Sequence, residues 1–185
     1  SPDGVLSAQA LVGSSFTASC GGGSGSTSTS VTLTMDEATA PTLAGFGGAE
    51  DAAIVADPAG GSNKVARVVK SATAELWAGT TVSTLPGNQI APIGFSATAK
   101  TVTVRVWSPA AGVPVRLKVE NAADPSKSVE TEATVTAANT WQTLSFDFGR
   151  PAAGTAALDL AATYNRASIF FNFGTPGSAT GARTY

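Results

Sequence analysis

Hydrophobic and polar positions alternate through much of this chain from Val31 onward. Val102, Val104 and Val106 are separated by single residues, so in an extended chain they project from the same face. The same spacing recurs at 113–119, 129–135 and 144–148. A period of two predicts half-buried β-strands with an apolar row inside and a polar row outside.

Turn sequences such as Asp57-Pro58, Pro86-Gly87-Asn88 and Asp124-Pro125 separate the alternating segments, and no segment has a sustained helical period. Many short strands with frequent turns indicate a sandwich or barrel. We therefore predict an all-β fold, an antiparallel β-sandwich of jelly-roll-like type. The expected strands are Val31–Asp36, Asp51–Ala56, Lys64–Lys70, Leu76–Ser83, Lys100–Ser108, Val113–Asn121, Lys127–Val135, Trp141–Phe148 and Arg166–Phe173.

The alternation also predicts which side chains form the core of this sandwich. Residues on the apolar side of each expected strand should pack together between the sheets. The expected core residues are Val104, Val106, Val115, Leu117, Leu144, Phe146, Phe171 and Phe173.

Two segments with a different composition precede the sandwich. Residues 1–20 are weakly apolar, with Val5, Ala8, Ala10 and Val12 loosely alternating, and residues 21–30 are a Gly/Ser/Thr run typical of a linker. We predict an N-terminal apolar arm (1–20), a linker (21–30) and a β-sandwich domain (31–185). Whether Cys20 carries a lipid stays open, because the residues before it match a lipoprotein signal poorly.

Composition narrows the function further. The net charge is −2 without a basic block, so phosphate neutralisation on nucleic acid is not expected. The chain has no apolar run long enough to span a bilayer. Low charge (13%) with abundant Gly, Ala, Ser and Thr is common in secreted and surface proteins. We expect an extracellular or cell-surface location.

Catalytic chemistry has few candidate residues here. The chain has no histidine and a single cysteine, which excludes Ser-His-Asp and Cys-His systems and zinc sites built on histidine or on cysteine clusters. Glu120, Glu130 and Glu132 could supply a glycosidase pair, but they lie on regular strands beside cations, where ion pairing is expected. We expect no enzymatic activity.

The segment Glu75–Thr81 is the best candidate for a binding site. Trp77 could stack on a sugar ring, while Glu75 and the outward row Arg116, Lys118 and Glu120 could bond its hydroxyls. Outward residues Arg105, Trp107, Glu130 and Glu132 would join them in one charged platform if their strands share a sheet. The alternatives are a core tryptophan at position 77 and a solvated face of ion pairs.

An ordered series of motifs resembles the non-catalytic, carbohydrate-binding-module-like β-sandwiches of secreted and surface bacterial proteins. The series comprises Gly45-Phe46-Gly47-Gly48-Ala49, Asp57-Pro58, Asn63-Lys64-Val65-Ala66, Val68-Val69-Lys70-Ser71, Glu75-Leu76-Trp77-Ala78-Gly79-Thr80-Thr81, Val104-Arg105-Val106-Trp107-Ser108-Pro109, Val115-Arg116-Leu117-Lys118-Val119-Glu120, Trp141-Gln142-Thr143-Leu144-Ser145-Phe146-Asp147-Phe148, Tyr164-Asn165 and Phe170-Phe171-Asn172-Phe173-Gly174. It covers roughly residues 31–185 and implies that the chain binds a polysaccharide.

The resemblance also implies a possible structural calcium ion, since acidic residues at the opening and closing strands of such modules often hold one. Here Met35-Asp36-Glu37 stands at the opening, so Asp36 and Glu37 are the candidate ligands, and Thr184-Tyr185 lies where the closing strand would begin. No other cofactor is expected.

A different class of function is the alternative. The chain could be a structural subunit of an extracellular filament, a surface layer or a virion. Without its closing strand the sandwich would have an open edge, and open edges pair with other chains. Residues 1–20 of a neighbouring copy could fill that edge by strand exchange.

Overall fold

The structure, a computed structural model, describes residues 31–185, and most of its strands lie within three residues of the bounds that alternation predicts. The arm (1–20) and the linker (21–30) lie outside the described residues. The elements are β1 (Thr42–Phe46), β2 (Ala52–Ala56), β3 (Lys64–Lys70), β4 (Gly79–Ser83), β5 (Thr101–Trp107), β6 (Pro114–Glu120), β7 (Ser128–Thr134), β8 (Trp141–Asp147), β9 (Arg166–Phe171), α1 (Gly177–Thr180) and β10 (Arg183–Thr184).

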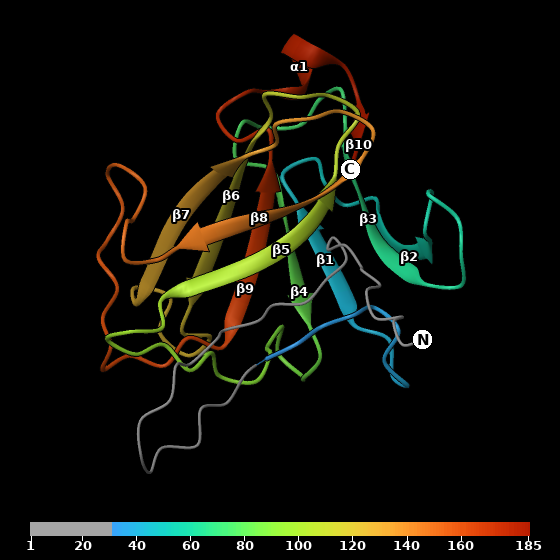
Figure 1. The fold of residues 1–185 in the computed structure, drawn as a ribbon. Helices are drawn as coiled ribbons and strands as arrows, with labels where there is room; N and C mark the ends of the chain where they lie inside the picture. Colours follow the sequence, from blue (N-terminus) through green and yellow to red (C-terminus); the bar gives the residue numbers. More distant parts are fainter. Residues whose placement is uncertain (1–30) are drawn as a thin grey trace.

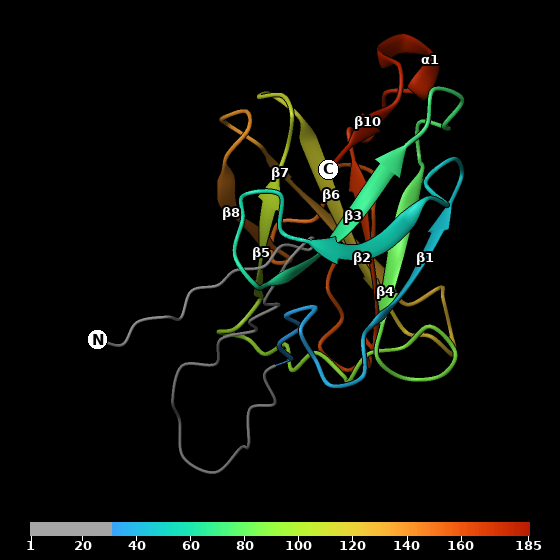
Figure 2. The ribbon, with the colours of Figure 1, turned by 90° about the vertical axis from the view of Figure 1, so that its right-hand side faces the viewer.

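These strands form two layers, and every strand pair is antiparallel. One layer is a continuous sheet in the order β1-β4-β9-β6-β7, called the large sheet below. The other layer consists of two separate pieces, β10-β3-β2 and β5-β8, and is called the divided layer (Figures 1 and 2). The prediction of an all-β antiparallel sandwich is confirmed, while the jelly-roll type stays a prediction.

The core between the layers contains most of the residues that alternation places there. Val106, Leu117 and Phe146 are fully buried, and Val104, Val115, Leu144 and Phe171 are also buried. The prediction for Phe173 is wrong. Asn172, just after β9, has a positive φ of 50°, which breaks the extended alternation and leaves Phe173 half-buried.

The opening segment Val31–Asp36 is not a strand, although its alternation holds. Val31, Leu33 and Met35 are buried, but Met35 has a φ of 67°, which turns the chain out of an extended path. The first strand is instead β1, whose sequence Thr-Leu-Ala-Gly-Phe lacks a clear alternation. The short strand β10 and helix α1 were also not predicted.

Candidate ligand-binding groove on the large sheet

Strand pairing in the large sheet brings together residues that are far apart in the sequence. Ser168 of β9 lies between Thr81 of β4 and Lys118 of β6. Two residues further along the same pair of strands, Arg166 of β9 lies opposite Glu120 of β6. Side chains at these positions project from the face that points away from the core, because their neighbours in sequence, such as Val82, Val119 and Ile169, belong to the hydrophobic core.

A groove of about 610 Å³ crosses this outer face. Aromatic rings lie at one part of it, charged side chains along the sheet, and small or neutral polar residues complete the lining. The lining residues are Phe46, Trp77, Thr81, Asn88, Arg116, Lys118, Glu120, Glu130, Ala153, Gly154, Thr155, Arg166, Ser168, Phe170 and Phe173.

The aromatic part of the groove, called the aromatic shelf, consists of Phe46, Trp77, Phe170 and Phe173. The ring of Phe46 lies nearly parallel to that of Trp77, with centroids 6.2 Å apart, and meets Phe170 edge-on at 5.7 Å. Phe170 in turn meets Phe173 edge-on at 5.8 Å. Trp77 is 48% exposed, so the alternative of a core tryptophan does not hold, and its ring is available to a ligand.

Gly79, the first residue of β4, makes room for the aromatic shelf. A Cβ atom at this position would lie 2.6 Å from Cδ1 of Phe170 and 2.9 Å from Cζ of Phe46. Such distances are far below van der Waals contact, so the two rings can lie over β4 only because position 79 has no side chain.

Arg116 links the shelf to the charged part of the groove. Its guanidinium lies over the Phe173 ring, with Cζ 3.7 Å from the centroid. It also forms ion pairs with Glu130 at 2.9 Å and with Glu132 at 2.7 Å, both on the neighbouring strand β7. These contacts fix the orientation of the guanidinium, whose side chain is only 14% exposed.

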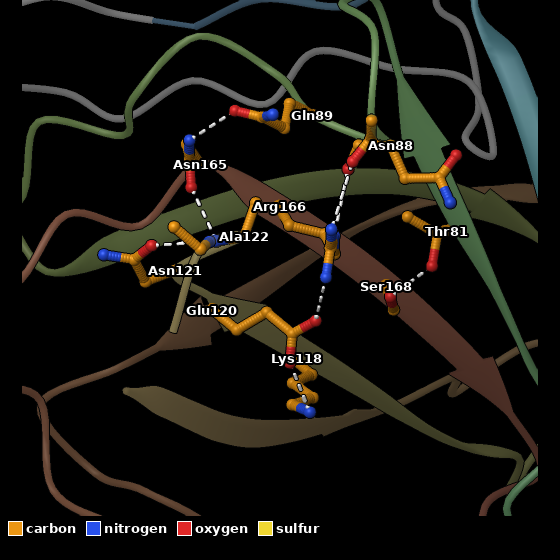
Figure 3. A network of polar contacts seen from close by, with 12 residues as sticks. Thr81, Asn88, Gln89, Lys118, Glu120, Asn121, Ala122, Asn165, Arg166 and Ser168 are labelled. Carbon is orange, nitrogen blue, oxygen red and sulfur yellow. Dashed lines mark hydrogen bonds and ion pairs between the residues drawn. The ribbon is translucent and has the colours of Figure 1, made fainter. Parts of the chain in front are cut away.

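A second ion-pair group lies further along the same face (Figure 3). Glu120 pairs with Lys118 on its own strand and with Arg166 on β9, the latter at 3.2 Å. Arg166 also donates hydrogen bonds to the carbonyl oxygens of Gly87 and Asn88, which ties the loop after β4 to the sheet. The hydroxyls of Thr81 and Ser168 are hydrogen-bonded at 2.7 Å beside this group.

Most of the candidate site residues therefore come together. Trp77, Arg116, Lys118 and Glu120 all line the groove, whereas Glu75 is exposed and does not line it. The single charged platform is not formed as expected. Arg105 and Trp107 belong to β5 in the divided layer, because β6 pairs with β9 and β7 instead.

Several groove residues were missed by sequence reasoning, above all Phe46, Phe170 and Arg166. Phe170 alternates with the core residues Ile169 and Phe171, so its outward direction could have been noticed. No such signal in the sequence marked Phe46, because β1 was not predicted. The pairing of β1 with β4, which brings Phe46 to the groove, depends on the tertiary fold.

Asp36 and Glu37, the predicted calcium ligands, each accept hydrogen bonds from the protein. Oδ1 of Asp36 accepts a hydrogen bond from the backbone N–H of Lys64 at 2.9 Å, and Oε1 of Glu37 accepts from the N–H and the hydroxyl of Thr34. Within residues 31–185 no group of three or more His, Cys, Asp or Glu side chains is placed to hold a metal. Oε2 of Glu37 is buried without a hydrogen-bond partner among the described residues. Calcium takes six to eight oxygen ligands, and the site at Asp36 and Glu37 stays a prediction.

Comparisons with family models, with curated proteins and with solved structures gave no match for this chain. Within the described part of the chain, no helix has the length and apolar character needed to cross a membrane.

Proposed function

We propose that this domain is a non-catalytic glycan-binding module that holds a polysaccharide in the groove of the large sheet. One observation carries the proposal: the exposed ring of Trp77 and the oriented polar side chains of Arg116, Lys118 and Glu120 line the same hollow. Aromatic faces stack on the apolar faces of sugar rings, and fixed charged groups hydrogen-bond sugar hydroxyls.

The preorganisation of the groove supports binding. Each charged side chain in it is already held by an ion pair or a backbone carbonyl, and the rings of the aromatic shelf pack on one another. A ligand would therefore meet groups whose rotamer freedom is already reduced, which lowers the entropy cost of binding. An open groove also suits a chain ligand, which must extend past the protein at both ends.

The carboxylates of the groove support a binding role over hydrolysis. Glycoside hydrolysis requires one carboxyl group that delivers a proton and a second that attacks or activates water. Glu120 is engaged by Lys118 and Arg166, and Glu130 is engaged by Arg116. Both serve as ion-pair partners that position cations, so we propose that the domain is not an enzyme.

Affinity electrophoresis in gels that contain neutral or acidic polysaccharides tests this function. The protein should be retarded by at least one polysaccharide, and Trp77→Ala should abolish the retardation while leaving the melting temperature nearly unchanged, because the ring is 48% exposed. Leu160→Ala is the matched control. It removes another apolar side chain that is 47% exposed but lies outside the groove lining.

Two outcomes of this experiment would contradict the proposal. If Trp77→Ala lowers the melting temperature strongly and no polysaccharide retards the wild type, Trp77 is structural and the proposal fails. If both alanine variants lose retardation equally, the ligand does not bind in the groove. A polysaccharide ligand would also fit the proposed extracellular or cell-surface location.

The second candidate, a structural subunit of a filament, surface layer or virion, is favoured by one observation. The divided layer has no described strand pairing that joins β10-β3-β2 to β5-β8, which is the kind of sheet opening that strand exchange fills. Light scattering during size-exclusion chromatography of the full chain separates the candidates. A polymer that depends on residues 1–20 would favour the structural subunit.

A further inference from the structure

The register of the large sheet arranges its outward side chains in rows that run across the strands. Thr81 of β4 lies opposite Ser168 of β9, and Ser168 lies opposite Lys118 of β6. Ala44 of β1 extends this row on one side, and Glu130 of β7 extends it on the other. Neighbouring strands are about 4.8 Å apart, so this row, called the middle row, spans roughly 19 Å from β1 to β7.

The middle row is lower than the rows on either side of it. Its side chains on β1, β4 and β9 are alanine, threonine and serine. The row on one side contains Phe46, Phe170 and Arg116, and the row on the other side contains Arg166 and Glu120. Because large side chains flank small ones, the groove follows the middle row, and the two flanking rows form its walls.

The charged side chains of these three rows neutralise one another. Among the described residues of the rows, the cations and the carboxylates are Arg116, Lys118 and Arg166, and Glu120, Glu130 and Glu132. Each of the cations forms an ion pair with at least one of the carboxylates. The groove therefore presents no net charge to a ligand.

Both guanidinium groups are committed to partners inside the protein. Arg166 donates through all three of its side-chain nitrogens, to Glu120 and to two carbonyl oxygens of the loop after β4 (Figure 3). Arg116 donates to two carboxylates on β7 and lies over the Phe173 ring. A carboxylate on a ligand would have to displace one of these contacts, and it would meet the carboxylates of the groove as like charges.

A ligand that has hydroxyls and no charge can use the same groups without displacing their partners. The ammonium of Lys118 has three N–H groups, and its partner among the described residues is the Glu120 carboxylate. Each carboxylate oxygen can accept a second hydrogen bond, and a sugar hydroxyl both donates and accepts. The hydroxyls of Thr81 and Ser168, bonded to each other at 2.7 Å, keep further acceptor positions on the floor of the groove.

We propose that the groove is specific for an uncharged polysaccharide whose chain lies along the middle row, across the strands. This inference rests on the proposed glycan-binding function and narrows its ligand class. Acidic chains are excluded by the ion pairs, which neutralise every cation that a uronate would use and leave carboxylates beside it. Binding that does not depend on opposite charges should also be insensitive to salt.

Affinity electrophoresis of the full chain tests the ligand class with neutral polysaccharides (laminarin, xylan, galactomannan and dextran) and acidic ones (alginate, polygalacturonate and hyaluronate). At least one neutral polysaccharide should retard the protein, and its dissociation constant in calorimetry should change less than about threefold between about 0.05 M and about 0.5 M NaCl. Stronger retardation by an acidic polysaccharide, or a larger effect of salt, overturns this inference and leaves glycan binding standing. No retardation by any of the seven overturns the proposed function itself.

A variant that removes one carboxylate tests the physical cause. Glu120→Gln keeps the shape of the side chain but releases Lys118 and Arg166 from the charge that they share. Alginate should then bind this variant at least about tenfold more tightly than it binds the wild type. Asp51→Asn is the matched control, because it makes the same change in net charge at an ion pair with Arg67 that lies outside the groove lining. Equal retardation of the two variants by alginate, including none of either, overturns the assignment of the specificity to the ion pairs.

Discussion

Replacing Gly79 with alanine should disturb the aromatic shelf and the stability of the sheet together. The added Cβ would lie 2.6 and 2.8 Å from Cδ1 and Cε1 of Phe170, and 2.9 Å from Cζ of Phe46. The backbone of Gly79 does not require a positive φ, so the substitution introduces no strain of its own in the main chain. The predicted effect therefore comes from the contact with the two rings.

The loss of stability in Gly79→Ala depends on how far the rings of Phe46 and Phe170 can move to relieve the contact. Phe170 is 7% exposed and packs edge-on against both Phe46 and Phe173, so its ring cannot swing away without displacing another. Overpacking of this kind costs about 1–3 kcal/mol. Urea unfolding should show this loss for Gly79→Ala, and retardation by a bound polysaccharide should weaken because the shelf is displaced.

A control variant and a double variant test whether the contact with the rings causes the loss of stability. Gly149→Ala, whose Cβ would meet only the flexible side chains of Asp147 and Lys100, should change the free energy of unfolding by less than about 0.5 kcal/mol. Combining Gly79→Ala with Phe170→Leu should cost less than the sum of the two single changes, because the clash is removed. If Gly79→Ala is as mild as Gly149→Ala, the reasoning about the shelf is wrong.

Three further predictions concern the core, a buried lysine and the ion pairs. Phe146→Ala empties a fully buried site and should lower the free energy of unfolding by about 3–5 kcal/mol in urea titrations, and a loss below about 1 kcal/mol would contradict the assigned core. Lys70 is buried, and its Nζ donates to the carbonyl oxygens of Phe171 and Asn172 at 3.3 and 3.0 Å, while burial lowers its pKa from the ordinary 10.5. Between that lowered pKa and pH 10.5 the unfolded chain binds more protons at Lys70 than the folded chain does. The free energy of unfolding of the wild type, relative to that of Lys70→Met, should therefore rise as the pH increases through this window. A difference between the two proteins that does not change with pH would contradict the lowered pKa. Glu120→Gln removes the charge that holds two cations, so it should cost about 1–2 kcal/mol at low salt and less in 1 M NaCl, and a loss unchanged by salt would show that the pairs contribute little.

The sequence by itself determined the fold class and the inward face of most strands. Valines at 102, 104 and 106 and the matching rows in β6 and β8 are buried as alternation requires, since a strand with one apolar face is stable only when that face is covered. The failures have local causes. The positive φ angles of Met35 and Asn172 interrupt extended segments. Asparagine adopts positive φ more often than most residues, so Asn172 carries a weak sequence signal, whereas methionine carries none.

Only the tertiary structure decided which strands became neighbours, and hence what the groove contains. Alternation fixes whether a side chain points inward or outward, but it does not fix the order of strands in a sheet. That order depends on loop closure and on packing between the layers, which places Arg166 beside Glu120 across 46 residues and Phe46 beside Trp77 and Phe170. The same order places Trp107 in the divided layer, where it lines a separate hollow together with Trp141 and Tyr185 instead of the groove.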